Sequence, residues 1–255
     1  MNNVTSPLAL MALACASLAA PQAQAASASS VLSNVYIQLF DLDPLDGITP
    51  SILIGNMSFA SGAAIDVASN SFSTNGPLGG ALSGSAAMGG SSTASSVFAG
   101  NLFVPASGNG AASSSSATGA GSSANSVGML HNDGFTLTPK TLVVVTATGQ
   151  ASAAAALGEF ATASAYVGLQ DAGGSNYSVG QAYWTVEAGG NTYGVGGPLT
   201  VQASFVNLTA APQSGSLYAI AYSSVIGVVP EPGSYALLLA GVLALGYLGQ
   251  RRSQA

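Results

Sequence analysis

The sequence predicts an all-β protein whose body, residues 26–229, folds as one antiparallel β-sandwich of the jelly-roll or immunoglobulin-like type. Three observations lead to this class. Apolar residues recur at every second position in several segments, glycine pairs stand between such segments, and the body has the length of a single sandwich. No internal repeat of roughly 20–50 residues is apparent, which argues against a solenoid or a propeller.

Alternation with a period of two is clear in residues 35–40 and 201–206. The run Leu142–Val145 suits a strand that is buried on both faces, and residues 217–222 place large side chains on one face and smaller ones on the other. We expect about nine to eleven short strands. The expected core residues are Val35, Ile37, Leu39, Leu142, Val144, Trp184, Phe205, Ile220 and Tyr222.

Glycine pairs predict two hairpin turns. Gly173-Gly174 and Gly189-Gly190 would join strands over residues 165–170, 177–187 and 192–195. The alanines of residues 151–156 favour a helix, but no capping residue and no apolar stripe supports one.

Two segments of low complexity, residues 79–96 and 106–126, consist mainly of Gly, Ala and Ser. Such residues bury little side chain, so we expect flexible loops on either side of a strand at Val97–Val104. Within a sheet, the same residues could instead form thin strands.

The chain has 3 Lys and Arg residues against 9 Asp and Glu, for a formal net charge of −6. Lys140 is the only basic residue between positions 26 and 250, which excludes a nucleic-acid binder because phosphate affinity needs several cations. Lys140 follows Pro139 without an upstream glycine series, and Leu199 stands where a dinucleotide fingerprint needs its third glycine. We therefore expect no nucleotide and no cofactor.

The N-terminal residues 1–25 have the features of a secretory signal peptide. Residues 8–20 are an apolar run too short to span about 30 Å of hydrocarbon, and Ala23 and Ala25 form a small-x-small cleavage site. The segment before this run lacks Lys and Arg. Leu13 stands two positions before Cys15, whereas a lipoprotein signal has its Leu three positions before the Cys. This spacing argues against a lipoprotein signal. Removal of Cys15 with the signal leaves no thiol, which fits export.

The C-terminal residues 230–255 contain a short motif, an apolar stretch and a basic pair. In order, these parts are Pro230, Glu231 and Pro232, then residues 235–249, then Arg251 and Arg252. The prolines keep the motif extended, the apolar stretch would form a transmembrane helix of about 22 Å, and the arginines would keep its end in the cytoplasm. This tail resembles the PEP-CTERM sorting signal of Gram-negative bacteria.

The resemblance implies recognition by an exosortase-type enzyme, which removes the tail and passes the body to the cell surface or the extracellular matrix. Until then, the C-terminal helix would hold the chain in the inner membrane. An ordinary permanent anchor is the alternative. Residues 40–50 and 135–142 also look similar to uncharacterised bodies of other PEP-CTERM proteins, which implies a shared sandwich scaffold without a known activity.

Asp41, Asp43 and Asp46 are weak candidates for calcium ligands, because a loop with alternate acidic residues can supply several oxygens. An EF-hand loop that began at Asp41 would need its bidentate Glu where Ile52 stands, and Pro44 breaks the usual spacing. We therefore expect a structural loop whose Asp side chains bond to their own backbone and whose last Asp begins a turn.

Catalytic constellations have little support. His131 could act as a base beside Asp133, but no Gly-x-Ser-x-Gly motif occurs, and residues 132–134 are typical of a turn before a strand. Glu159 and Glu187 could form a glycosidase pair only at a suitable separation, which the sequence does not reveal.

Aromatic residues offer one candidate sugar platform. Trp184, with Tyr183 and Tyr177 nearby, could stack on a sugar ring. Alternation points Trp184 and Tyr183 to opposite faces, so we expect Trp184 in the core.

Together these observations favour an exported, non-enzymatic surface or extracellular-matrix protein that an exosortase-type system sorts and cleaves, with a link to exopolysaccharide or biofilm. Two alternatives stay open. One is a carbohydrate-binding or calcium-dependent adhesion module that uses Trp184 or the acidic loop, and the other is a secreted hydrolase.

Overall fold

The described residues of the computed structural model are all β. They comprise residues 26–65, 68–76, 80–88, 91–105, 109–117, 122–155, 159–173, 177–186 and 192–227. Within these ranges the chain forms fourteen strands and no helix, which confirms the all-β class. The predicted signal helix and the predicted transmembrane helix both lie outside the described ranges. Among the residues described, no helical segment offers a membrane-crossing span.

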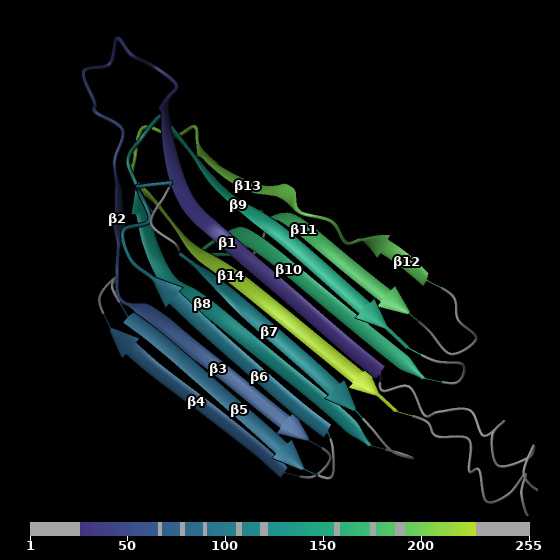
Figure 1. Cartoon of the computed structure of the whole chain (residues 1–255). Coiled ribbons are helices and arrows are strands. Elements are labelled where there is room, and N and C mark those ends of the chain that lie inside the picture. Colours follow the sequence, from purple (N-terminus) through teal and green to yellow (C-terminus); the bar gives the residue numbers. More distant parts are fainter. Residues whose placement is uncertain are drawn as a thin grey trace, which may run out of the picture.

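The strands form two antiparallel sheets that lie face to face (Figure 1). In spatial order, the six-stranded sheet consists of β13 (Leu199–Asn207), β9 (Thr141–Ala154), β1 (Ala26–Asp41), β7 (Gly110–Ala117), β6 (Ser91–Ala99) and β5 (Gly80–Met88). The eight-stranded sheet consists of β12 (Thr192–Val195), β11 (Tyr177–Val186), β10 (Phe160–Asp171), β14 (Gln213–Ile226), β8 (Ser123–Leu137), β3 (Met57–Ile65) and β4 (Ala68–Gly76), with β2 (Ile52–Ile54) paired to β8. The jelly-roll or immunoglobulin-like subtype stays a prediction.

The two low-complexity segments form strands, so the expectation of loops over residues 79–96 and 106–126 is wrong. Most of the first segment is β5 and β6, and most of the second is β7 and the start of β8. The strand expected over residues 97–104 is only the end of β6. Small residues suit these strands because the sheets are close: a Cβ on Gly128 would lie 2.5 Å from the backbone oxygen of Ser96 in the other sheet.

The strand pairings predicted around the glycine pairs are confirmed. β10 pairs with β11, and β11 pairs with β12, both antiparallel. Gly174, Gly189 and Gly190 themselves lie outside the described residues. Residues 151–154 continue β9 as a strand, so the helical preference of their alanines is overridden by pairing with β1.

Part of the expected core is confirmed. Val35, Ile37 and Phe205 are buried, and Leu39 packs against the core as a partly buried residue. The side chain of Trp184 lies outside the described residues.

Four expected core residues are only half-buried, so their assignment to the core is wrong. They are Leu142, Val144, Ile220 and Tyr222. Their neighbours are buried instead, namely Val143, Val145, Ala219 and Ala221. On β14 the smaller side chains face inward and the larger ones lie on the opposite face. One of the larger ones, Tyr218, packs edge to face against Tyr166, with ring centroids 6.0 Å apart.

A β-bulge in β1 changes which residues face the core. The register of β1 against β9 shifts between Ser33 and Tyr36, and Asn34 has a φ of 53° in the left-handed region that Asn tolerates. Before the bulge the even-numbered residues are buried, and from Val35 onward the odd-numbered residues are. The buried Asn109 supports the bulge, because its backbone oxygen accepts from Val35 N and its Nδ2 donates to Val35 O, each at 3.1 Å.

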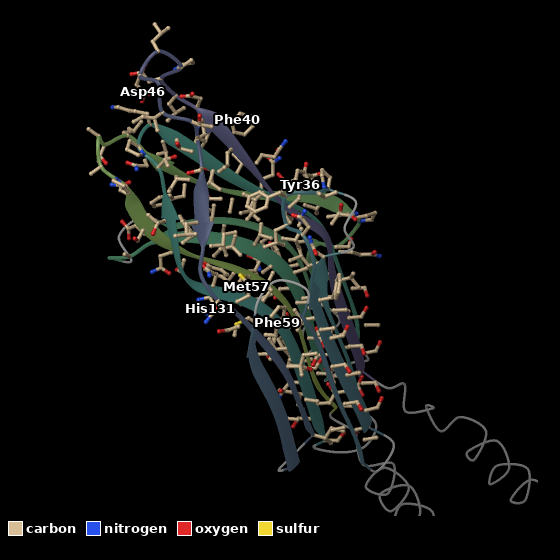
Figure 2. All side chains as sticks on the ribbon, turned by 90° about the vertical axis from the view of Figure 1, so that its left-hand side faces the viewer. Tyr36, Phe40, Asp46, Met57, Phe59 and His131 are labelled. Atoms are coloured by element: carbon tan, nitrogen blue, oxygen red, sulfur yellow. The ribbon has the colours of Figure 1, made fainter. Side chains whose placement is uncertain are left out.

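The interior divides along the strands into two halves. We call the first the apolar half; its largest buried side chains are Leu32, Val35, Met57, Phe59, Leu102, Leu130, Phe135, Leu137, Val143, Leu169 and Leu217. We call the second the hydroxyl half; apart from Ile65 and Val225, its buried residues are mostly small ones, among them Ala26, Ala28, Ala117, Ala124, Ala161 and Ala163, together with Ser30, Ser61, Thr93, Ser95, Ser113, Ser115, Ser126 and Ser223. In Figure 2, Asp46 lies at one tip of the molecule and Phe59 lies near the middle.

Side-chain hydroxyls bridge the two sheets in the hydroxyl half. Ser30 of β1 donates to the backbone oxygen of Tyr222 in β14 at 2.9 Å. Thr93 of β6 donates to the backbone oxygen of Asn125 in β8 at 3.0 Å. Because such short side chains reach the opposite backbone, the sheets here are closer than the ~10 Å usual for stacked sheets.

The buried hydroxyls also bond to one another. The Oγ of Ser223 lies 2.9 Å from that of Ser115 and 3.0 Å from that of Ser126. The Oγ atoms of Ser61 and Ser95 lie 2.6 Å apart. The hydroxyl half therefore combines little apolar burial with satisfied polar groups, which avoids the desolvation cost of leaving a buried hydroxyl without a partner.

Candidate functional site

The acidic loop lies at the tip of the apolar half (Figure 2). Asp41 is the last residue of β1, and its Oδ1 accepts from the backbone N of Asp43 at 2.9 Å. Asp46 Oδ1 accepts from the backbone N of Ile48 at 2.7 Å, and Gly47 between them has a φ of 72°. This is the backbone-bonded loop that the sequence predicts. That it does not bind calcium stays a prediction.

Metal ligands are not gathered in the part of the chain that the structure describes. No group of three or more His, Cys, Asp or Glu side chains is placed there to hold an ion. Asp43 and Asp46 are exposed to solvent.

His131 lies within β8, half-buried, in register with Ser58 of β3 and Tyr218 of β14. Residues 132–134 are not a turn, so that expectation is wrong: β8 continues through them to Leu137, and they form a bulge where the register against β14 shifts. The side chain of Asp133 lies outside the described residues. The structure therefore does not place it against His131.

Of the other candidates, the structure describes the side chains of only two, Glu159 and Tyr183. Glu159 is buried just before β10, and Glu187 lies outside the described residues. Tyr183 is exposed on β11, whereas the side chains of Tyr177 and Trp184 lie outside the described residues.

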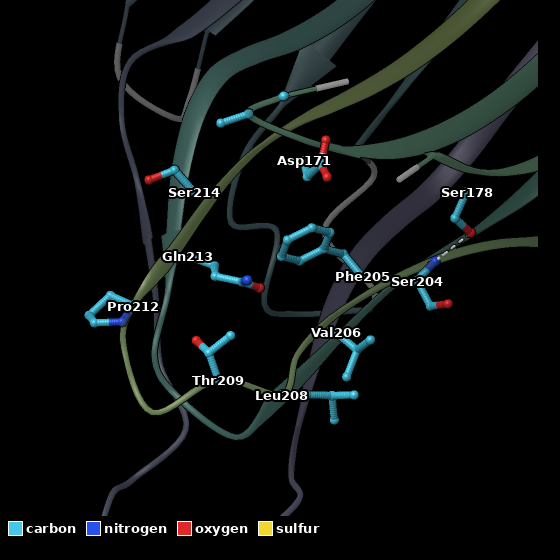
Figure 3. A pocket seen from close by; sticks show the side chains of 12 residues that line it. Asp171, Ser178, Ser204, Phe205, Val206, Leu208, Thr209, Pro212, Gln213 and Ser214 are labelled. Atoms are coloured by element: carbon cyan, nitrogen blue, oxygen red, sulfur yellow. Dashed lines mark hydrogen bonds between the residues drawn. The ribbon is translucent and has the colours of Figure 1, made fainter. Parts of the chain in front are cut away.

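An open cavity of about 840 Å³ lies between the β10–β11 hairpin, β13 and the connection from β13 to β14 (Figure 3). Its lining residues are Asp171, Ala172, Gly173, Ser178, Ser204, Phe205, Val206, Leu208, Thr209, Pro212, Gln213 and Ser214. We call it the Phe205 pocket. Its volume suits a ligand of small-molecule size.

An aromatic ring and polar side chains together line the Phe205 pocket. Figure 3 shows the Phe205 ring between the carboxylate of Asp171 and the amide of Gln213. Phe135 packs against the Phe205 ring edge to face, with ring centroids 5.5 Å apart. No Lys, Arg or His is among the lining residues. An apolar surface with carboxylate, amide and hydroxyl groups around it suits a neutral ligand rich in hydroxyls.

The wall of the pocket is held by Asn207, whose side chain is fully buried. Its Nδ2 donates to the backbone oxygens of Thr138 and Ala211 at 3.0 and 2.9 Å, and its Oδ1 accepts from Thr209 N at 3.0 Å. These bonds fix the connection between β13 and β14. They hold one wall of the Phe205 pocket in place.

Sequence reasoning missed the Phe205 pocket. The sequence correctly predicts Phe205 in the core, but its lining partners come from segments around residues 171, 178 and 213 that only the fold brings together. Asp171 and Gln213 occupy strand ends, where polar residues are ordinary. No local pattern marks them as a site.

The predicted processing residues lie outside the described residues. They are Ala23 and Ala25 at the signal end, and Pro230, Glu231, Pro232, Arg251 and Arg252 in the tail. The strand that leads to the tail, β14, ends at Ile226 and is paired on both sides, with β10 and β8. The tail therefore follows directly from an inner strand of the eight-stranded sheet.

Comparison with protein families identifies the tail. The PEP-CTERM protein-sorting motif matches residues 228–253. The chain therefore carries a PEP-CTERM sorting signal, as its resemblance implied. This signal marks an exported protein that an exosortase-type enzyme processes after transient anchoring in a membrane. No curated protein and no solved structure matches the chain.

Proposed function

We propose that the protein is a non-enzymatic component of the cell surface or extracellular matrix that associates with neutral exopolysaccharide in a biofilm. The match of the sorting motif to residues 228–253 carries this proposal, because it directs the body out of the cell. The composition supports a structural role: only 5% of the residues are charged and His131 is the single histidine, so groups for acid–base catalysis are scarce.

Two surfaces support an association with neutral polysaccharide. The first is the Phe205 pocket, whose lining combines one aromatic ring with carboxylate, amide and hydroxyl groups. The second is the outer face of the six-stranded sheet, where the register places small side chains in rows across five strands. One such row is Ser85, Ala94, Ser114, Ser29 and Ser152. Hydroxyls on an uncharged face can exchange hydrogen bonds with sugar hydroxyls without the cost of desolvating ions.

The sorting half of the proposal is tested by replacing Pro230, Glu231 and Pro232 together with Ala in the producing bacterium. The helix and the basic pair stay intact, so we expect insertion without release, and the full-length body should collect in the inner-membrane fraction. A Pro105→Ala variant controls for loss of a proline elsewhere. Release of the triple variant at the same shortened mass as the parent, measured by mass spectrometry of the medium, would contradict the proposal.

The binding half is tested by affinity electrophoresis through gels that contain the exopolysaccharide of the producing strain. We expect the protein to be retarded, and Asp171→Ala or Gln213→Ala in the Phe205 pocket to reduce the retardation several-fold, since each loses about one hydrogen bond. Gln202→Ala, exposed on β13, is the matched control. An unretarded parent protein would refute the association. Equal retardation of all variants would instead assign it to the outer face.

A further inference from the structure

The two long sides of the body differ in how the sheets end. On one side the six-stranded sheet ends in β13 and the eight-stranded sheet ends in β12, which has only four residues. β13 packs against β11, the neighbour of β12: a Cβ on Gly180 of β11 would lie 2.2 Å from the backbone N of Gln202 in β13. Ser204 N of β13 donates to the Oγ of Ser178 in β11 at 3.0 Å. Lys140 Nζ bonds to the carbonyl just beyond β13. The two sheets therefore do not end in a pair of long strands on this side, and a cation lies beside its end.

The opposite side ends in β5 of the six-stranded sheet and β4 of the eight-stranded sheet. Both strands have nine residues and lie against each other across the interface between the sheets (Figure 1). Each is paired with its inner neighbour over nine successive positions without a register shift. Among the described strands, none pairs with their outer edges.

These two edges lack the devices that usually prevent strand addition. Natural edge strands are protected by Lys, Pro, bulges or short length. Neither β4 nor β5 contains a charged residue, a proline or a bulge. The nearest such residues in the sequence, Asp66 and Pro77, lie beyond the ends of β4. Two straight, uncharged edges therefore present backbone N–H and C=O groups side by side.

We propose that the β4 and β5 edges pair with the same two edges of a second copy of this chain. A twofold axis perpendicular to the sheets sets β5 antiparallel to its copy and β4 antiparallel to its copy at the same time. Both sheets then continue across the interface. Because neither strand carries a charge, no repulsion opposes the pairing.

The geometry favours a dimer over a fibre. Each copy uses the side on which two nine-residue edges end together, whereas its other side offers β13 and only the four-residue β12. A fibre would need a second side with two long edges. The twofold axis also reverses the strands, so β14 of the two copies ends at opposite ends of the dimer. Two copies that are both anchored in one membrane by their tails have the same orientation, whereas the dimer needs opposite orientations. The dimer therefore forms after release of the tail, and this step rests on the proposed function.

The dimer itself is tested on the full chain solubilised in detergent, where no membrane orients the copies. Sedimentation equilibrium should give the mass of two chains. Replacing both Ser83 and Ser85 of β5 by Lys places like charges at the junction and should weaken the dimer on the order of 100-fold. Replacing Thr200 and Gln202 of β13 by Lys adds the same charge to the opposite side of the body and should leave the dimer intact.

Hydrogen exchange provides a readout without substitutions. Amides of residues 80–88 should become more protected as the concentration of the parent protein rises, whereas those of residues 199–207 should not change. Three results would each overturn the proposal. They are a parent protein that stays monomeric, a dimer that only the β13 variant dissociates, and hydrogen exchange in β5 that does not depend on protein concentration. None of these results depends on processing of the tail, so the sorting proposal fails or stands separately.

Discussion

The apolar half and the hydroxyl half share the same strands, yet they are stabilised in different ways. In the apolar half, side chains such as Phe59, Leu130 and Phe135 fill the space between the sheets. In the hydroxyl half, Ala and Ser leave little space to fill, and hydroxyls such as those of Ser30 and Thr93 reach the opposite backbone. Close packing can thus be reached by large side chains or by a short distance between sheets.

The difference predicts opposite sensitivities. The apolar half should respond mainly to the loss of volume, because burial of large side chains supplies its stability. The hydroxyl half should respond mainly to added volume and to the loss of hydrogen bonds, because its sheets have no room to spare.

The largest effect is expected from Phe59→Ala in the apolar half. Phe59 is 1% exposed, so its truncation leaves a cavity and should lower the free energy of unfolding by about 3–5 kcal/mol. Leu53→Ala is the control, since Leu53 is 74% exposed and should change the value by no more than about 0.5 kcal/mol. Urea unfolding followed by circular dichroism measures both. A loss below about 1 kcal/mol for Phe59→Ala would contradict the role given to the apolar half.

The next effect separates two glycines of the same strand, β8. A Cβ on Gly128 would lie 2.5 Å from the backbone oxygen of Ser96, whereas one on Gly134 would meet nothing within 4 Å. Gly128→Ala should therefore cost about 1–3 kcal/mol by forcing the sheets apart, while Gly134→Ala should be close to neutral. Equal unfolding midpoints for the two variants would show that the sheets separate easily and would weaken the comparison.

A smaller effect is expected within the hydroxyl cluster. Ser223→Ala and Ser115→Ala should each cost about 1–2 kcal/mol, because each leaves buried hydroxyl partners with fewer bonds. The double variant should cost less than the sum, since both changes remove the same bond. Ser224→Ala, half-buried on the outer face of the same strand, is the control. Strict additivity in the denaturation data would argue against a coupled network.

The smallest effect concerns the acidic loop beyond the apolar half. Asp46→Ala removes the acceptor for Ile48 N and should cost about 0.5–1 kcal/mol, whereas Asp46→Asn keeps an acceptor oxygen and should cost less. Millimolar calcium should leave the thermal midpoint unchanged if the loop is structural. A calcium-dependent rise that Asp43→Ala abolishes would instead establish an ion site there.

The sequence by itself determined the all-β class, several strand pairings and the sorting tail. Each of these follows from a local property: alternation with a period of two, glycine pairs between strands, or the order of motif, apolar run and basic pair. The acidic loop was predictable for the same reason, because Asp41 and Asp46 bond to backbone only two residues away.

Only the tertiary structure decided which face of each strand is buried and what the Gly, Ala and Ser segments become. Ala219 rather than Ile220 faces inward, and the bulge at Asn34 reverses the buried face within β1. A bulge or a change of sheet leaves no periodic trace, and a run of small residues is compatible with either a loop or a thin strand. The distance between the two sheets depends on the side chains of both sheets together. The hydroxyl bridges and the Phe205 pocket depend on this distance in turn.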